Sequence, residues 1–322
     1  MKKIWCILSI GCALLFLFAA CGAKESSDAG GNGNETQDGR LSVYASFYPM
    51  YDFTVKIGGD KVSVTNMVPA GTEPHDWEPA AADLAGLEAA DVFICNGAGM
   101  EHWAEDILDV LQNKDLIVAE ASAGISLLEG RDEHGDEEEA AEEEEHEDEG
   151  YDPHVWLDPL NAKRETENIK NALVSADPDN AAYYEANYEK YAAELDALDA
   201  AFREALSPLP NKDIIVAHEA FGYLCAAYGL KQVPIEGLSP DSEPDPAKMA
   251  EIIDFAQEHA LKVIFFEELV SPKVAEAVAE AVGAETKVLS PIEGLSDEDL
   301  AAGGDYFSVM HQNLEALKLA LQ

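Results

Sequence analysis

Residues 178–206 of this 322-residue chain, PDNAAYYEANYEKYAAELDALDAAFREAL, predict one long helix. Large apolar side chains recur there at intervals of four and three residues, namely Tyr184, Tyr188, Tyr191, Leu195, Leu198 and Phe202. This spacing puts them in one stripe along a helix about 40 Å long, at ~1.5 Å per residue. A coiled-coil dimer is the alternative, but the stripe is short for that. We expect a helix that spans two parts of one chain.

The sequence on both sides of this helix repeats one pattern, in which short, mostly β-branched apolar segments alternate with helical segments. Before the helix, strands are predicted at 43–47, 62–68, 92–96 and 117–119, with helices at 79–90 and 100–112. After it, strands are predicted at 213–217, 232–235, 263–267 and 286–289, with helices at 221–228, 246–259 and 271–282. Such alternation implies parallel sheets. The predicted fold class is α/β, with two α/β lobes around central sheets, joined by one long rigid helix.

We expect an N-terminal lobe at 41–175, the connecting helix at 176–210 and a C-terminal lobe at 211–322. A mature part of about 280 residues agrees with two lobes. Cys95 and Cys225 lie in apolar surroundings in different predicted lobes. Two buried free thiols are therefore favoured over a disulfide.

The N-terminus predicts export from the cytoplasm. Lys2 and Lys3 precede an apolar run at 4–18 and then the residues FAACG, which end a signal peptide predicted at 1–20. Cys21 resembles the lipidated cysteine of a bacterial lipobox, although Phe18 stands where leucine is usual. Plain secretion is one alternative, and an uncleaved anchor is the other, for which a span of ~20 apolar residues is required. Residues 21–40 are polar and predict a flexible tether. We therefore expect a lipid anchor on the extracytoplasmic face of the cell membrane.

The chain is strongly acidic, with a formal net charge of −44. This charge argues against a nucleic-acid partner and against a basic membrane-docking face. Part of it is local, because residues 129–150 hold fourteen Asp or Glu residues and one Arg. An acidic surface attracts cations only weakly, so charge alone is poor evidence for a metal site.

Three histidines, each in a short loop-like segment, are the candidate metal ligands. They are His75 in EPHDWEP, His154 in DPHVWLDP and His218 in IIVAHE. A fourth candidate is Glu293 in LSPIEGL. Three imidazoles and one carboxylate suit zinc. Imidazole also favours zinc over manganese, which prefers oxygen ligands.

The predicted elements bring these four residues together. His75 follows the second strand, His154 precedes the connecting helix, His218 ends the fifth strand, and Glu293 follows the last strand. Open α/β sheets bind ligands beyond the carboxyl ends of their strands. We therefore expect a metal site in the cleft between the lobes, with two ligands from each lobe. Trp77 and Trp156, each two residues after a candidate ligand, are expected to pack the ligand loops.

The chain resembles the metal-binding lipoproteins of bacterial ABC importers, and among them the zinc-specific (ZnuA-type) and adhesin-lipoprotein members. The resemblance covers roughly 41–322, and the motifs PAGTEPHDWEP at 69–79, DPHVWLDP at 152–159, AHEAFGY at 217–223 and LSPIEGL at 289–295 carry it. It implies a monomer that captures Zn²⁺ and delivers it to an ABC permease and its ATPase. Mn²⁺ or iron as the carried metal, and a surface adhesin, are the alternatives.

The resemblance also bears on the fourth ligand. Many members place an Asp just after the last strand, where this chain has Ser290, whereas similar zinc members use a Glu in a Pro-x-Glu segment, which matches Glu293. Glu73 or water is the alternative. Manganese-type members resemble a site with two His and two carboxylates, whereas the third position here is His218.

Two further features have competing interpretations. The acidic loop at 129–150 contains His134 and His146, and it is either a solvated loop or, like an insertion in zinc-specific relatives, a weak zinc-gathering segment. The pair His218-Glu219 superficially resembles a zinc hydrolase motif. However, residue 222 is Gly, so the second histidine of His-Glu-x-x-His is missing. No enzymatic activity is expected.

Overall fold

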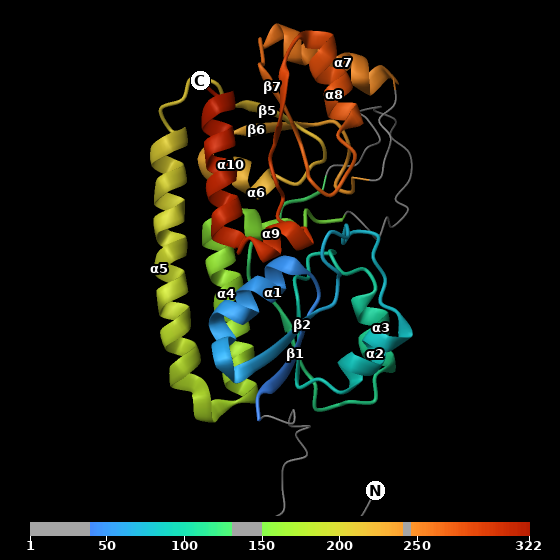
Figure 1. The fold of residues 1–322 in the computed structure, drawn as a ribbon, viewed down its shortest axis with the longest axis vertical. Coiled ribbons are helices and arrows are strands. Elements are labelled where there is room, and N and C mark those ends of the chain that lie inside the picture. The colour runs from blue at the N-terminus through green and yellow to red at the C-terminus, as the bar shows by residue number, and fades with distance from the viewer. Residues whose placement is uncertain (1–38, 131–149, 241–245) are drawn as a thin grey trace, which may run out of the picture. The chain divides into compact units, whose positions relative to one another are not determined.

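Two four-stranded parallel sheets form the framework of the protein (Figure 1). The structure, a computed structural model, describes residues 39–130, 150–240 and 246–322. The predicted signal peptide, nearly all of the tether, Cys21, His134 and His146 lie outside the described residues. We call the described residues before Pro159 the first half and those after Leu206 the second half.

The first half contains the sheet with strand order β2-β1-β3-β4. Its strands are β1 (Leu41–Ala45), β2 (Val62–Asn66), β3 (Val92–Cys95) and β4 (Ile117–Glu120), and its helices are α1 (Tyr48–Gly58), α2 (Ala81–Glu88) and α3 (Ala104–Val110). Val43 of β1 pairs with Val64 on one side and with Val92 on the other. Every residue of β3 is buried, as expected of a central strand with helices on both faces.

The second half repeats this arrangement with the order β6-β5-β7-β8. Its strands are β5 (Asp213–Val216), β6 (Lys231–Pro234), β7 (Val263–Phe266) and β8 (Glu285–Val288). Its helices are α6 (Gly222–Tyr228), α7 (Pro246–Glu258), α8 (Lys273–Val282), α9 (Asp297–Ala301) and α10 (Tyr306–Ala320). All eight predicted strands are present, with ends that differ from the prediction by at most two residues.

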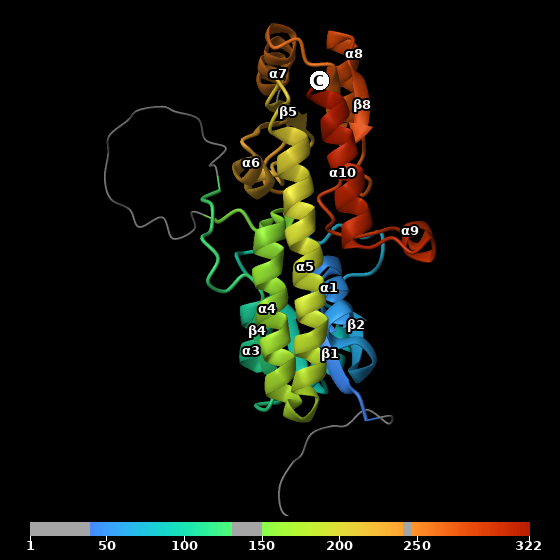
Figure 2. The same cartoon turned by 90° about the vertical axis from the view of Figure 1, so that its left-hand side faces the viewer.

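Two adjacent helices lie between the halves in the chain, and the longer one extends along both halves (Figure 2). The long helix is α5 (Ala181–Leu206), and a 3-10 turn at Pro178–Asn180 replaces the first residues of the predicted helix. Before it runs α4 (Pro159–Ala176), which the sequence pattern did not reveal as a separate helix. Its buried face includes the polar Glu165 and Thr166, which interrupt the apolar stripe. Pro159 occupies the first turn, and Asp158 accepts a hydrogen bond from the Leu160 N–H, as at a typical helix start.

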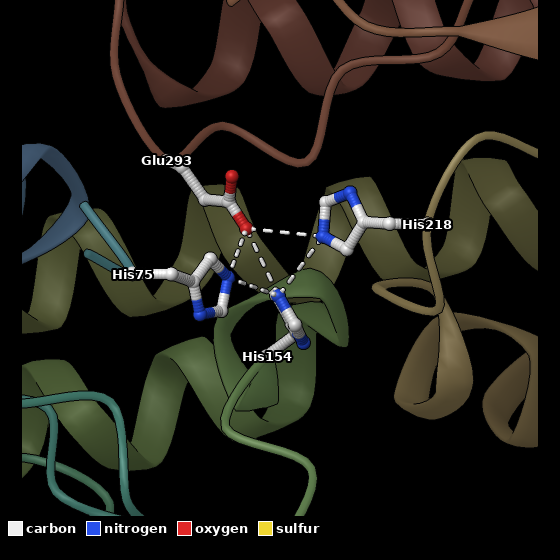
Figure 3. Close-up of side chains that lie close together, drawn as sticks. All are labelled: His75, His154, His218 and Glu293. Atoms are coloured by element: carbon white, nitrogen blue, oxygen red, sulfur yellow. Dashed lines mark hydrogen bonds and ion pairs between the residues drawn. The ribbon is translucent and has the colours of Figure 1, made fainter. Parts of the chain in front are cut away.

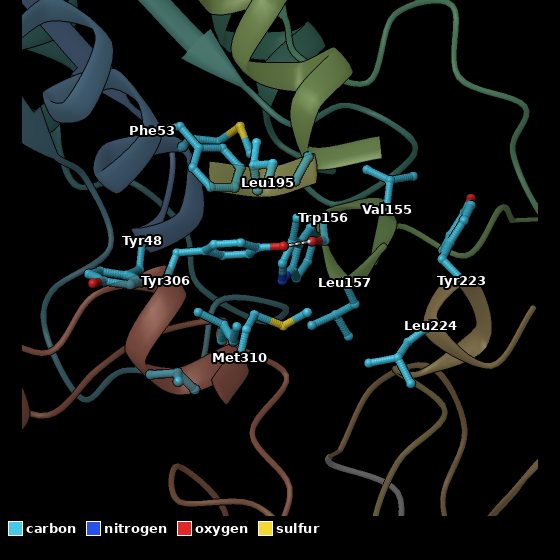
Figure 4. Packing of buried hydrophobic residues seen from close by; sticks show 14 of the residues in the cluster. Tyr48, Phe53, Val155, Trp156, Leu157, Leu195, Tyr223, Leu224, Tyr306 and Met310 are labelled. Atoms are coloured by element: carbon cyan, nitrogen blue, oxygen red, sulfur yellow. Dashed lines mark hydrogen bonds between the residues drawn. The ribbon is translucent and has the colours of Figure 1, made fainter. Parts of the chain in front are cut away.

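The apolar stripe of α5 is buried along almost its whole length, including Tyr184, Leu195 and Phe202. The helix packs on α1 and α4 at one end and on α6 and α10 at the other. One hydrophobic cluster therefore includes residues of both halves, among them Phe53 of α1, Leu195 of α5 and Met310 of α10 (Figure 4). The described residues fall in one compact unit for this reason.

One smaller prediction also has an outcome in the described residues. Cys95 and Cys225 are buried free thiols, as predicted. No helix of the described part combines the length and the apolar character that a membrane span requires.

Candidate metal centre

Four side chains from four separate loops meet between the two halves (Figure 3). His75 lies in the loop after β2, and His154 precedes the short 3-10 helix Val155–Leu157 that leads into α4. His218 follows β5, and Glu293 follows β8. Each half contributes two of the four side chains, at the carboxyl ends of parallel strands or next to them.

The facing atoms of these side chains are close together. Glu293 Oε1 lies 3.1 Å from His75 Nε2, 2.9 Å from His154 Nε2 and 3.3 Å from His218 Nε2. His154 Nε2 lies 3.3 Å from the Nε2 atoms of both His75 and His218. Tetrahedral zinc, with bonds of about 2.0–2.2 Å, separates its ligand atoms by roughly 3.3–3.6 Å. The cluster therefore has nearly the dimensions of a tetrahedral zinc shell, and all four ligand atoms lie within 4.8 Å of one another.

Two buried carboxylates contact the imidazoles of His154 and His218 at the nitrogen that faces away from the cluster. His154 Nδ1 lies 2.8 Å from Asp152 Oδ1, and His218 Nδ1 lies 2.6 Å from Glu267 Oε1. In the neutral imidazole, the carboxylate accepts a hydrogen bond from the Nδ1–H, so the Nε2 lone pair faces the cluster. Partners of this kind orient histidines that bind metals and increase their basicity.

The sequence interpretation did not single out Asp152 and Glu267, although a signal for each was present. Asp152 lies two residues before His154, and its carboxylate also accepts a hydrogen bond from the His154 backbone N–H. Glu267 directly follows β7, which pairs with β5, the strand before His218. An acid at the carboxyl end of a neighbouring parallel strand is therefore well placed to reach that histidine.

Glu73, the alternative fourth ligand, has another role in the structure. Its two carboxylate oxygens accept hydrogen bonds of 3.0 and 3.1 Å from the backbone N–H of His75. Glu73 therefore shapes the His75 loop and is not among the four clustered residues. His75 is the most accessible of the four, with 11% of its side chain exposed, whereas the other three are at most 2% exposed.

The electrostatics of the cluster favour protons on His154 and His218 when no metal is bound. Burial lowers the pKa of His154, but hydrogen bonds to Asp152 and Glu293 outweigh burial and raise it above the ordinary value. Burial also lowers the pKa of His218, yet the charges of Glu267 and Glu293 raise it well above that value. Burial raises the pKa of Glu293, whereas His218 and His75 hold it well below its ordinary range. A metal cation that enters must therefore displace protons.

The loop that carries Glu293 is held firmly by α10. Ser290 N donates a hydrogen bond of 2.9 Å to Asn313 Oδ1, and Asn313 Nδ2 donates one of 2.7 Å to Ser290 O. Ile292 has a backbone φ of 61°. This left-handed conformation is unusual for a β-branched residue, so surrounding contacts must maintain it.

Trp77, Trp156 and His102 lie outside the four-residue cluster. The ring of Trp156 is buried 5.3 Å from that of His154, and Trp77 packs edge-on against Trp103 at 5.6 Å. His102 is half exposed, with its Nε2 atom 3.9 Å from Glu78.

A buried set of three histidines and one glutamate, contributed by two parallel α/β sheets, defines a metal-binding protein of the two-lobed solute-binding class. A model of the family described as zinc-uptake complex component A, periplasmic, matches residues 43–320. The chain belongs to this family.

Three relatives illustrate the similarity. The high-affinity zinc uptake system protein ZnuA of Bacillus subtilis is 45% identical over 324 residues, which cover 100% of this chain and 99% of that protein. The zinc-binding lipoprotein AdcA of Streptococcus pneumoniae is 40% identical, and this chain spans only 61% of its length. The Zn(II)-bound ZnuA-like domain of that AdcA superposes with a TM-score of 0.75 at 38% identity, covering 88% of this chain and 99% of the domain.

The third relative is the laminin-binding protein Lmb of Streptococcus agalactiae, described as bifunctional, with adhesin and metal transporting activity. Its structure superposes with a TM-score of 0.76 at 33% identity, over 88% of this chain and 100% of Lmb.

Proposed function

We propose that this protein is an extracytoplasmic solute-binding protein that captures one Zn²⁺ ion through His75, His154, His218 and Glu293 and delivers it to an ABC permease. The observation that carries the proposal is the near-tetrahedral spacing of the four ligand atoms, 2.9–3.3 Å for the pairs around Glu293 Oε1. The names of the B. subtilis and S. pneumoniae relatives, both zinc proteins, support the same metal.

Zinc is favoured over Mn²⁺ or iron by the ligand chemistry. Three imidazoles and one carboxylate form a borderline-soft set, whereas manganese prefers more oxygen ligands and a higher coordination number. The carboxylates of Asp152 and Glu267 face the far nitrogens of two histidines instead of the cluster.

We propose that the protein carries zinc and does not catalyse a reaction. Four protein ligands fill a tetrahedral zinc shell and leave no position for an activated water, which a hydrolytic zinc site needs. Gly222 also stands where a His-Glu-x-x-His motif would place its second histidine. We therefore propose that the protein is not an enzyme.

The setting of this function is proposed from the sequence. Cys21 would carry the lipid anchor on the extracytoplasmic face, and lobes at 41–175 and 211–322 would present the site to the permease and its ATPase, with the protein acting as a monomer. The acidic loop with His134 and His146 would gather zinc weakly. We do not propose adhesion or nucleic-acid binding, because no described residue specifies such a partner.

Competition titrations with a chromophoric chelator test the proposal. The chain from Gly22 should bind one equivalent of Zn²⁺ tightly and Mn²⁺ much more weakly. His218→Ala should abolish tight binding, and Glu293→Gln should weaken it. His102→Ala, which removes a half-exposed histidine outside the cluster, is the matched control and should bind zinc like the unaltered protein. Absence of tight zinc binding in the unaltered protein would overturn the proposal.

A further inference from the structure

One hydrogen bond joins the two ligand loops that come from opposite halves. Trp156 Nε1 donates to the carbonyl oxygen of Pro291 over 2.7 Å, and both groups are buried. Trp156 lies two residues after His154, and Pro291 lies two residues before Glu293. The bond therefore connects the Trp156 side chain, near His154, with the backbone near Glu293.

The Trp156 end of this bond is rigid. Its side chain is 0% exposed, and its ring packs edge-on against Phe47 with the centroids 5.0 Å apart. Tyr306 of α10 donates a hydrogen bond of 2.7 Å to the Trp156 backbone oxygen (Figure 4). The indole N–H therefore points at Pro291 from a fixed position, because packing and a second hydrogen bond both hold the residue.

The conformation of the chain at the Pro291 end depends on contacts with the surrounding structure. The neighbouring Ser290 is held by Asn313, and the next residue, Ile292, has a φ of 61°. An isoleucine does not keep this conformation unless the surrounding structure maintains it. The Pro291 carbonyl lies between these two features. A hydrogen bond there helps to fix the turn that directs Glu293 towards the three histidines.

We infer that Trp156 is a positioning residue for Glu293 and links that ligand to the contact between the two halves. Separation of the halves breaks the bond between Trp156 and Pro291, lets the Ile292 turn relax and withdraws the carboxylate from the zinc. Loss of the fourth ligand is then the first step of zinc release. This inference rests on the proposed zinc site and adds a residue that does not itself bind the metal.

A double-mutant cycle tests the inference on the purified protein. Trp156→Phe keeps an aromatic ring and removes the N–H donor. We expect it to weaken zinc binding by ~10–100-fold, the range for partners that orient metal ligands. Because its effect runs through Glu293, Trp156→Phe should cause no further loss in a Glu293→Gln background. Equal losses in both backgrounds would overturn the inference, because they would indicate a general structural role.

Cobalt(II) spectra give an independent measure of the ligands. The Trp156→Phe spectrum should shift towards that of Glu293→Gln, whereas Trp103→Phe, a buried tryptophan variant outside the ligand loops, should keep the unaltered spectrum and zinc affinity. If Trp156→Phe does not fold, benzothienylalanine at position 156 removes the N–H with almost no change in shape. Zinc binding that is intact in the unaltered protein and in either Trp156 variant would overturn this inference alone. Failure of the unaltered protein to bind zinc would overturn the proposed function as well.

Discussion

His218 Nδ1 and Glu267 Oε1 lie 2.6 Å apart in the interior of the second half, with both side chains at most 3% exposed. The carboxylate fixes which imidazole nitrogen carries the proton and directs the other at the metal cluster. Glu267 thus sets the orientation of a proposed zinc ligand without facing the zinc itself.

Glu267→Gln should therefore weaken zinc binding by ~10–100-fold, because the neutral amide supports the imidazole less well than a carboxylate. The measurement is a competition titration at pH 7.5. Glu258→Gln, an exposed change at the end of α7, is the control and should leave the affinity unchanged. A Glu267→Gln protein with unaltered affinity would contradict the orienting role.

The raised pKa of His218 predicts an unusual pH dependence of stability. A histidine whose pKa is raised in the folded protein adds stability that is complete below ~6.5 and is lost as pH rises through the raised value. The metal-free protein should therefore lose thermal stability as the pH rises above about 6.5 and through the raised pKa of His218. Zinc displaces these protons, so the increase in Tm on adding zinc should grow over the same range.

Thermal unfolding at several pH values, with and without zinc, measures both trends. The His218→Ala protein without metal isolates the contribution of this histidine and should show a flatter dependence. An increase in Tm with zinc that stays constant from pH 6 to pH 9 would argue against competition between zinc and protons.

The long helix α5 provides a prediction about stability. Phe202 is fully buried, and its ring stacks on that of Tyr228 in α6 with the centroids 5.0 Å apart. Phe202→Ala should lower the free energy of unfolding by ~3–5 kcal/mol, because it leaves a cavity between α5 and the second half. Urea unfolding measures this loss. The exposed neighbour Glu204→Ala should change it by less than about 0.5 kcal/mol.

Features with a local signature were predictable from the sequence. The eight strands appear as short apolar runs between helical patterns, and the loops of His75 and His218 follow two of these strands. Glu293 was a candidate from its place after the last strand, but the choice of Glu293 over Glu73 or water depended on the resemblance to a Pro-x-Glu segment. The structure places its carboxylate oxygen within 3.3 Å of three imidazoles.

Features that depend on contacts between distant residues were not predictable in this way. The hydrogen bond from Trp156 to Pro291 joins residues 135 positions apart, and the left-handed turn at Ile292 has no signal in its residue type. The helix α4 was missed for a different reason. Its buried face carries Glu165, which a hydrophobic pattern counts as a surface position.

Glu165 itself provides the last prediction. It is 0% exposed, and neither carboxylate oxygen makes a hydrogen bond within the described part of the protein. Burial, and then the charge of Glu101, raise its pKa well above the ordinary value. An acid with a raised pKa costs the folded state increasingly more as pH rises from about 4.3, because the unfolded chain ionises first.

Glu165→Met, which fills a similar volume without charge, should therefore stabilise the protein by ~1–3 kcal/mol at pH 8 and by less at pH 4. Urea unfolding at both pH values measures the difference. Glu189→Met, at an exposed position of α5, should show no such pH-dependent gain. A loss of stability in Glu165→Met at pH 8 would mean that the carboxyl group makes a favourable interaction in the core, so its burial would then be stabilising.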